Sequence, residues 1–406
     1  MAERKKRRYL HEVDLMRVIF IGGVLLNHTT TAFESRLEDT STSQLLLEAT
    51  HLALHFTRMG FMFMTGLVLV LNYYHRDHHW LKFWKKRYLG AGVPYIGWNA
   101  IIMLVATLAA GPLVWPAYWS HLGDALLKGN EYYMYYIVVT FQLYLLFPLI
   151  VKLFKRFANQ HALILGISFV LQLLLVVGIK YWLPHVDTTN WWYLFKDYGV
   201  NVLVYQFYFI AGGLVAVHYD AVVAWVNQHH RLLGWGTLGL SIGTVALYFG
   251  DKNILHLSAA ATFSVHQPFI FIYDVVIILF VFWLGLQYVT ARQGRLPEWI
   301  DRLIQAFSKV SFGIYLTQSL PIFLLYGILG RVNAPAWVVL AALPLGYLLV
   351  AGGALGISWF CYKVPPFGIL IGRPNWHPFS KGAHAHVKSH LKINPTAKAS
   401  INSENH

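Results

Sequence analysis

Two ionisable residues in the first apolar segment have a spacing that could serve chemistry. Arg17 and His28 are eleven residues apart, close to three helical turns, so they share one face of a helix. A rise of 1.5 Å per residue separates them by about 16 Å, half the hydrocarbon thickness of a bilayer. Asp14 lies one turn before Arg17 and can pair with it. The simpler alternative is that Arg17 anchors the helix at the interface and His28 is hydrogen bonded inside a bundle.

The second apolar segment carries a similar pattern. His51, His55 and Arg58 recur at i, i+4 and i+7 on one helical face, which predicts that Arg58 lies near the middle of the membrane. A charge there costs about 2.5–3.5 kcal/mol, so we prefer a functional interpretation over an Arg58 that only joins two helices through carbonyl groups. Beside His28, this cation favours the neutral imidazole that a base or nucleophile needs.

A cluster of cations precedes the third segment. The stretch His75–His79 is followed by Lys82, Lys85, Lys86 and Arg87. Such a cluster suits a phosphate-rich ligand such as coenzyme A, although topology signalling alone explains many clusters of this kind. The histidines have neither a fixed spacing nor a carboxylate partner, and the single Cys361 cannot form a cysteine cluster. No metal site is predicted.

Composition sets the environment of these residues. The chain has 406 residues, of which 57% are hydrophobic and 12% charged, whereas soluble domains carry roughly 25% charged residues. The net charge of +14 is spread in short clusters between apolar runs, and this argues against a nucleic-acid partner. We therefore predict an all-α, polytopic membrane helix bundle of about ten transmembrane helices. The segments are 13–33, 49–73, 88–111, 132–151, 161–181, 199–218, 232–250, 267–290, 309–330 and 336–362.

The distribution of Arg and Lys predicts the orientation. Most of them lie before the first segment, in alternate loops and after the last segment, which places both termini in the cytoplasm of a multi-pass cell-membrane protein. The predicted parts are a cytoplasmic basic N-terminus (1–12), a transmembrane domain (13–365) and a polar, disordered cytoplasmic tail (366–406).

Several further polar residues fall inside the predicted helices. Amides in membrane segments more often join helices than catalyse reactions, and this is the interpretation for Gln142, Gln172, Gln206 and Gln318. Asp274 is an exception that calls for a test, because it is a carboxylate one to two turns into the eighth segment.

These residues together resemble the acyltransferase-3 family of membrane-bound O-acyltransferases over about residues 9–365. The first helix matches the family pattern of a basic residue, ten residues and a His at Arg17 and His28. Further matches are Arg58 with Thr65-Gly66, Arg87 with Pro94, the fourth-helix residues Gln142, Tyr144 and Pro148, and the segment Ser311–Leu316. The chain departs from the pattern at Gly90 and Ala91, where a second Arg is expected. It also departs before the fourth helix, where a frequent His appears as Tyr133 or Met134, and at Gln318, where the family often has His.

The resemblance implies transfer of an acyl group, usually acetyl, from cytoplasmic acyl-CoA to a hydroxyl of an extracytoplasmic or lipid-linked glycan in the cell envelope. Arg17, Lys86 and Arg87 would bind the coenzyme, most often acetyl-CoA. His28 would be the general base or a transient acyl carrier, and Arg58 would stabilise the oxyanion or set the state of His28. Asp14 completes the catalytic candidates. The acceptor, membrane lipids and a separate extracytoplasmic transferase are the expected partners.

Two other function classes compete with this hypothesis. An exporter of polysaccharide or lipid-linked sugar would also have ten or more helices, but paired broken helices in two corresponding halves are expected for it, and the sequence shows no such symmetry. A purely structural subunit of a cell-envelope synthase is the third possibility.

Overall fold

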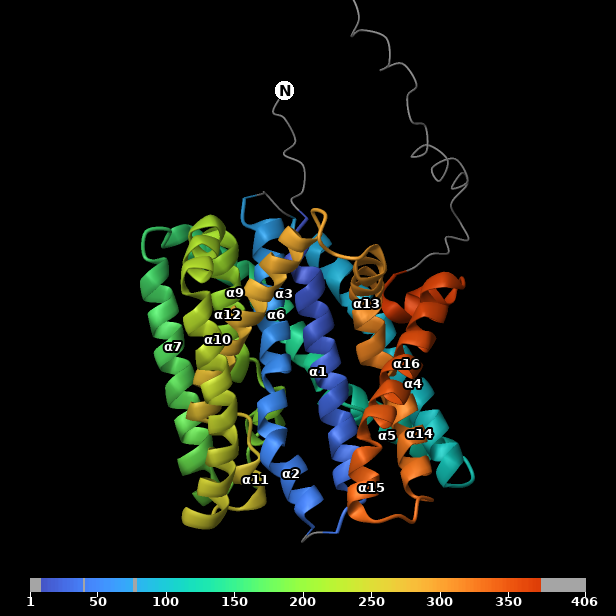
Figure 1. Ribbon diagram of the computed structural model, residues 1–406. Helices are drawn as coiled ribbons and strands as arrows, with labels where there is room; N and C mark the ends of the chain where they lie inside the picture. Colours follow the sequence, from blue (N-terminus) through green and yellow to red (C-terminus); the bar gives the residue numbers. More distant parts are fainter. Residues whose placement is uncertain (1–8, 39–40, 76–78, 374–406) are drawn as a thin grey trace, which may run out of the picture.

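The chain folds into a bundle of helices, as predicted. The computed structural model describes residues 9–38, 41–75 and 79–373, and within these ranges it contains helices and connecting loops without a strand. The basic residues 1–8, most of the His75–His79 stretch and the tail from 374 onward lie outside the described residues. Figure 1 shows long helices standing side by side, with the chain entering at one end of the bundle. We call this end the N-terminal face.

Each of the ten predicted segments is helical. The main elements are α1 (Glu12–Glu34), α2 (Thr42–His51), η1 (Leu52–Leu54), α3 (Phe56–Tyr73), α4 (Trp80–Ala110), α5 (Trp115–Lys128), α6 (Tyr135–Arg156), α7 (His161–Val177), η5 (Val202–Tyr205), α9 (Gln206–Val217), α10 (Tyr219–Phe249), α12 (Pro268–Ala291), α13 (Glu298–Thr317), α14 (Ser319–Leu329), α15 (Ala336–Ala341) and α16 (Leu343–Lys363). Short elements complete the loops: η2 (Gly178–Trp182), η3 (Leu183–His185), α8 (Tyr193–Lys196), η4 (Tyr198–Val200), η6 (Gly250–Ile254), α11 (Ala259–Thr262) and η7 (Phe367–Ile371).

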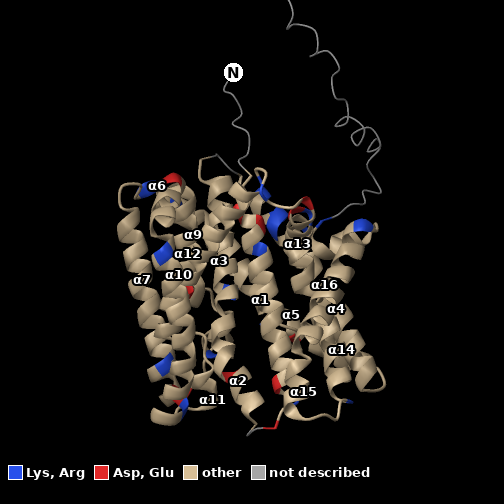
Figure 2. Ribbon diagram, in the orientation of Figure 1, with Lys and Arg blue, Asp and Glu red and all other residues tan. Residues whose placement is uncertain are grey.

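Length and hydropathy identify which of these helices can cross a membrane. Among the described residues seven are long and apolar enough, and the bent pair α13–α14 makes eight. The other two predicted segments correspond to α1, whose 23 residues include several charges, and to Val202–Val217, which is apolar but shorter. Figure 2 shows that charged residues gather toward the two ends of the bundle, while most of the helical length carries none.

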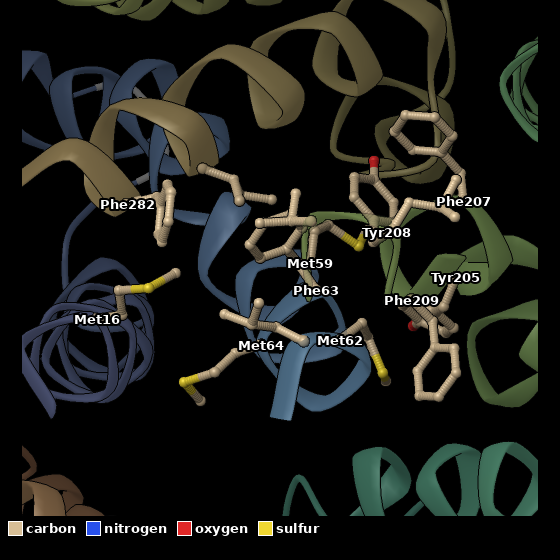
Figure 3. Close-up of a cluster of buried hydrophobic side chains, with 14 of the residues drawn as sticks. Met16, Met59, Met62, Phe63, Met64, Tyr205, Phe207, Tyr208, Phe209 and Phe282 are labelled. Carbon is tan, nitrogen blue, oxygen red and sulfur yellow. The ribbon is translucent and has the colours of Figure 1, made fainter. Parts of the chain in front are cut away.

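Helix α1 joins two hydrophobic clusters. Its first half contributes Met16 and Phe20 to a cluster built mainly from α3, α6, α9 and α12. Its second half contributes Leu25 and Phe33 to a cluster built mainly from α4, α13, α14 and α16. Figure 3 shows the first cluster, in which methionines of α1 and α3 lie among aromatic rings of α9 and α12. Unbranched methionine fills irregular gaps between such rings.

The closest helix contact lies between α3 and α9. A Cβ added at Gly66 would be 2.1 Å from the carbonyl oxygen of Phe209, and one at Gly212 would be 1.9 Å from that of Phe63. Only glycine permits backbones to approach this closely. Gly66 belongs to the Thr-Gly pair noted in the sequence, and its role is to seat α3 deep in the bundle. The segment Thr42–Tyr73 is accordingly the most buried of the seven candidate spans.

The ninth predicted segment is not one straight helix, because α13 and α14 meet at 60°. Pro321 in the first turn of α14 lacks the N–H that would pair with the carbonyl of Thr317.

The tail predicted from 366 begins too early. Residues Phe367–Ile371 form a helical turn that packs on α4, α13 and α16. Ile371 is buried, and the indole of Trp98 donates a hydrogen bond to the carbonyl of Leu370 at 2.8 Å. The polar composition of the tail predicted disorder from residue 366. Its first turn instead packs on the bundle through Ile371 and through the carbonyl of Leu370.

Candidate active site

A cavity of about 170 Å³ lies inside the bundle between α1, α3 and α13. Arg17, His28 and Arg58, which were selected from the sequence, all line its wall. The other lining residues are Val24, Asn27, His55, Thr57, Phe61, Met64, Tyr133, Tyr135, Tyr136, Ser311, Phe312 and Tyr315. The structure thus brings together residues that are up to about 300 positions apart, and we call this space the central cavity.

His28 is oriented by an aromatic ring. Its imidazole stacks on Tyr133, with ring centroids 3.7 Å apart and planes inclined by 27°. Tyr133 and the preceding Tyr132 both have positive φ angles, 65° and 53°, a conformation that costs non-glycine residues energy and persists only where the surroundings enforce it. The Tyr315 hydroxyl donates to the carbonyl of Tyr133, and the Ser319 hydroxyl donates to that of Tyr132 at 3.2 Å. Tyr315 of α13 and Ser319 of α14 therefore fix the loop that contains Tyr133, and the ring of Tyr133 in turn packs on His28.

Arg58 approaches the central cavity from α3. Its guanidinium lies 5.0 Å from the centroid of the Tyr135 ring, and it interacts electrostatically with the Tyr205 hydroxyl and the Asp274 carboxylate. Asp274 is fully buried and accepts a hydrogen bond from Tyr208 at 2.9 Å. Asp274 does not line the cavity.

Histidines surround Arg58. The rings of His51 and His55 lie 4.6 Å apart, and His266 packs against Tyr198 and Tyr205. Burial and the charge of Arg58 together lower the pKa of the His266 imidazole, in the loop before α12, to about 3. This ring is therefore neutral. His266 was not selected from the sequence, because nothing local connects it with α3.

Asp14 lies at the N-terminal face and not in the central cavity. Its carboxylate is 3.8 Å from the guanidinium of Arg17 and accepts hydrogen bonds from Tyr9 at 2.8 Å and from Ser308 at 2.7 Å. The side chain is buried and joins α1 to α13. Asp14 thus orients Arg17, which does reach the cavity.

Lys86 and Arg87 line a second cavity of about 300 Å³, which we call the basic cavity. The guanidinium of Arg87 is surrounded by the rings of Tyr73, Phe83 and Tyr144 at 5.8–5.9 Å, and its buried Nε has no hydrogen-bond partner within the described part of the chain. Gly90 and Ala91, where the family pattern has a second Arg, border this same space. Small residues there leave the cavity open.

The two cavities meet at two aromatic residues. Tyr136 and Phe312 line both of them, and the Tyr136 hydroxyl is 3.1 Å from the hydroxyl of Thr65, which belongs to the basic cavity. A linear ligand bound at Arg87 could therefore extend past Tyr136 and Phe312 toward His28. Neither aromatic residue was assigned this place from the sequence.

The amides inside the helices mostly join helices, as expected. Gln142 donates to the carbonyl of Val200 at 2.7 Å, Gln172 donates to that of Val204 at 2.9 Å, and Gln206 donates to that of Ser168 at 2.8 Å. Gln318 donates to Tyr315 within its own helix turn, at the bend between α13 and α14.

Comparison with known proteins identifies the family of the chain. The model of the acyltransferase-3 family, described as an acyltransferase domain, matches residues 10–363. A protein of Bacillus subtilis (strain 168), named "Putative membrane-bound acyltransferase YfiQ", is 23% identical over 338 residues, which cover 83% of this chain and 86% of that protein. No solved structure matches the chain significantly. The chain belongs to the acyltransferase-3 family and is a membrane-bound acyltransferase.

Proposed function

We propose that this protein transfers an acyl group, most often acetyl, from acyl-CoA to a hydroxyl of an extracytoplasmic or lipid-linked glycan. The observation that carries this proposal is the junction of the basic cavity with the central cavity at Tyr136 and Phe312. This junction connects Arg87, toward the N-terminal face, with His28, which lies deeper in the bundle.

The basic cavity suits the coenzyme. Lys86 and Arg87 stand at the start of α4, where they can bind phosphate groups, and the planar guanidinium of Arg87 can do so through two parallel hydrogen bonds. The unpartnered Nε of Arg87 is a donor available for this purpose. The pantetheine arm then passes between Tyr136 and Phe312, and Arg17 faces it from α1.

The chemistry takes place at His28. A ring nitrogen of His28 accepts the proton of the acceptor hydroxyl while the hydroxyl oxygen attacks the thioester carbonyl carbon. The carbon–sulfur bond breaks, the acyl group stays on the acceptor oxygen, and the sulfur takes the proton from His28 and leaves as the coenzyme thiol. Arg58 stabilises the negative charge that develops on the carbonyl oxygen. An acyl-His28 intermediate would follow the same geometry in two steps.

Topology supports this direction of transfer. The cationic clusters at the N-terminal face fit the cytoplasmic side of a cell membrane, where acyl-CoA is found. The central cavity reaches about 16 Å further along α1, toward the opposite side. A separate extracytoplasmic transferase could carry the group onward to its final glycan.

The test follows radiolabelled acetyl-CoA with purified protein, comparing wild type with His28→Ala and His28→Gln. Coenzyme release and protein-bound label are measured over time. His121→Ala is the matched control, since His121 is an exposed histidine on α5 outside both cavities. We expect both His28 variants to lose transfer and the control to retain it. Normal turnover by both His28 variants would exclude this mechanism, and a wild type inactive with acetyl-CoA would be tested next with succinyl-CoA.

A further inference from the structure

The central cavity contains polar groups that the donor and the reacting atoms do not use. Asn27 precedes His28 on α1, is 7% exposed, and its side-chain Nδ2 has no hydrogen-bond partner among the described residues. His55 precedes α3, is 8% exposed, and its Nε2 is likewise unpartnered. Both residues line the central cavity.

Buried polar groups without a hydrogen-bond partner lower the stability of the folded protein. A buried donor or acceptor without a partner costs about 1–3 kcal/mol, so most native structures satisfy such groups with protein, water or ligand. Asn27 adjoins His28 on α1, about 15 Å along the helix from Arg17, and His55 is three residues before Arg58. In the proposed function the thioester reaches them past Tyr136 and Phe312, which line both cavities.

The two groups indicate the chemistry of their partner. The amide nitrogen of Asn27 only donates, whereas Nε2 of His55 donates or accepts according to its tautomer. A hydroxyl both donates and accepts, so hydroxyl groups satisfy both residues in either tautomer. The cavity is lined by Arg17 and Arg58 and, among the described residues, by no Asp or Glu, so a cationic partner is disfavoured there.

We propose that Asn27 and His55 form a subsite for a polyhydroxylated acceptor, in which they bind hydroxyls next to the one that is acylated. This inference rests on the proposed function and adds two acceptor-binding residues to it. The cavity volume of about 170 Å³ is roughly ten times what a single water needs, so the subsite accepts more than a bridging water. Because two fixed groups bind the acceptor, one of its hydroxyls faces His28 and the others do not. Transfer to that hydroxyl is therefore regiospecific.

The experiment measures acceptor preference with purified protein and saturating acetyl-CoA. The probes are four neutral sugars (glucose, galactose, mannose and N-acetylglucosamine), and 1-propanol is the acceptor with a single hydroxyl. Wild type is compared with Asn27→Ala, Asn27→Asp and His55→Phe, and the ratio of kcat/KM for the best sugar to that for propanol is the readout. Asn72→Ala is the matched control: Asn72 lies on α3, donates to the carbonyl of Val68 at 2.7 Å and lines neither cavity.

We expect wild type to prefer at least one sugar over propanol, and each subsite variant to lower this preference about tenfold, the value of one buried hydrogen bond. Asn72→Ala should leave the ratio unchanged. Unchanged ratios in all three subsite variants would overturn the inference, as would a wild type that acylates propanol as well as every sugar or that turns over acetyl-CoA without acylating any sugar. The first two results leave the proposed function intact, because acyl transfer to a sugar is still observed; the third also counts against its glycan acceptor. A wild type that releases no coenzyme under any of these conditions contradicts the proposed function itself.

Discussion

The contact between α3 and α9 makes a quantitative prediction for Gly66→Ala. The added Cβ would lie 2.1 Å from the carbonyl oxygen of Phe209, about 1 Å closer than real Cβ contacts occur. The neighbouring atom is backbone, so no side chain can move aside and the two helices must separate by about 1 Å. Overpacking of this kind costs about 1–3 kcal/mol.

The displacement reaches the active site because α3 is continuous between the two positions. Arg58 lies eight residues before Gly66, about 12 Å along the helix, and moves with it relative to His28 on α1. Misplacing a reacting or stabilising group by about 1 Å can cost about 10²-fold in rate. We expect kcat/KM for acetyl-CoA turnover to fall by up to this factor, with a lowered unfolding temperature in detergent.

Coenzyme release and thermal unfolding are measured on the same preparations, beside two further variants. Gly212→Ala, whose Cβ would lie 1.9 Å from the carbonyl oxygen of Phe63, should reproduce the defect from the α9 side. Gly239→Ala on α10 is the control, because a Cβ there meets nothing within 4 Å. If Gly66→Ala stays within twofold of Gly239→Ala in rate and has the same unfolding temperature, the argument from close packing fails.

Two further predictions concern the buried ion pair and the aromatic stack. Lys180 and Asp251 form a fully buried ion pair just after the ends of α7 and α10. Lys180→Met should lower the free energy of unfolding by about 3–5 kcal/mol, because it leaves the charge of Asp251 uncompensated. The double variant Lys180→Met/Asp251→Leu should recover most of this loss. Unfolding by SDS in mixed micelles measures both, and a double variant as unstable as the single one would contradict this account. Tyr133→Ala removes the ring that stacks on His28 and should lower kcat for coenzyme release about tenfold, whereas Tyr133→Phe keeps the ring and should change it less than twofold. Equal losses in the two variants would show instead that the Tyr133 hydroxyl acts in the reaction.

Some of this protein was determined by its sequence alone. Eight of the ten helical segments follow from length and hydropathy, because a helix in lipid must be apolar along about 20 residues whatever its neighbours are. Arg17 and His28 share a face, and Arg58 lies deep in the bundle, because helical periodicity and rise are local properties. That Arg17, His28 and Arg58 line one cavity depends in addition on the packing of α1 against α3.

Other features were decided only by the tertiary structure. The sequence did not indicate that Tyr133 would stack on His28, that Gly66 would meet Phe209, or that the turn after Pro366 would dock on α4. Each of these contacts joins residues that are about 100 or more positions apart. Neither periodicity nor hydropathy specifies which helix faces another, since that depends on how complementary side chains pack. Asp14 shows the same limit: its spacing predicted the pairing with Arg17, but only the packing of α13 against α1 showed that Ser308 completes its hydrogen bonds at the face of the bundle, away from His28.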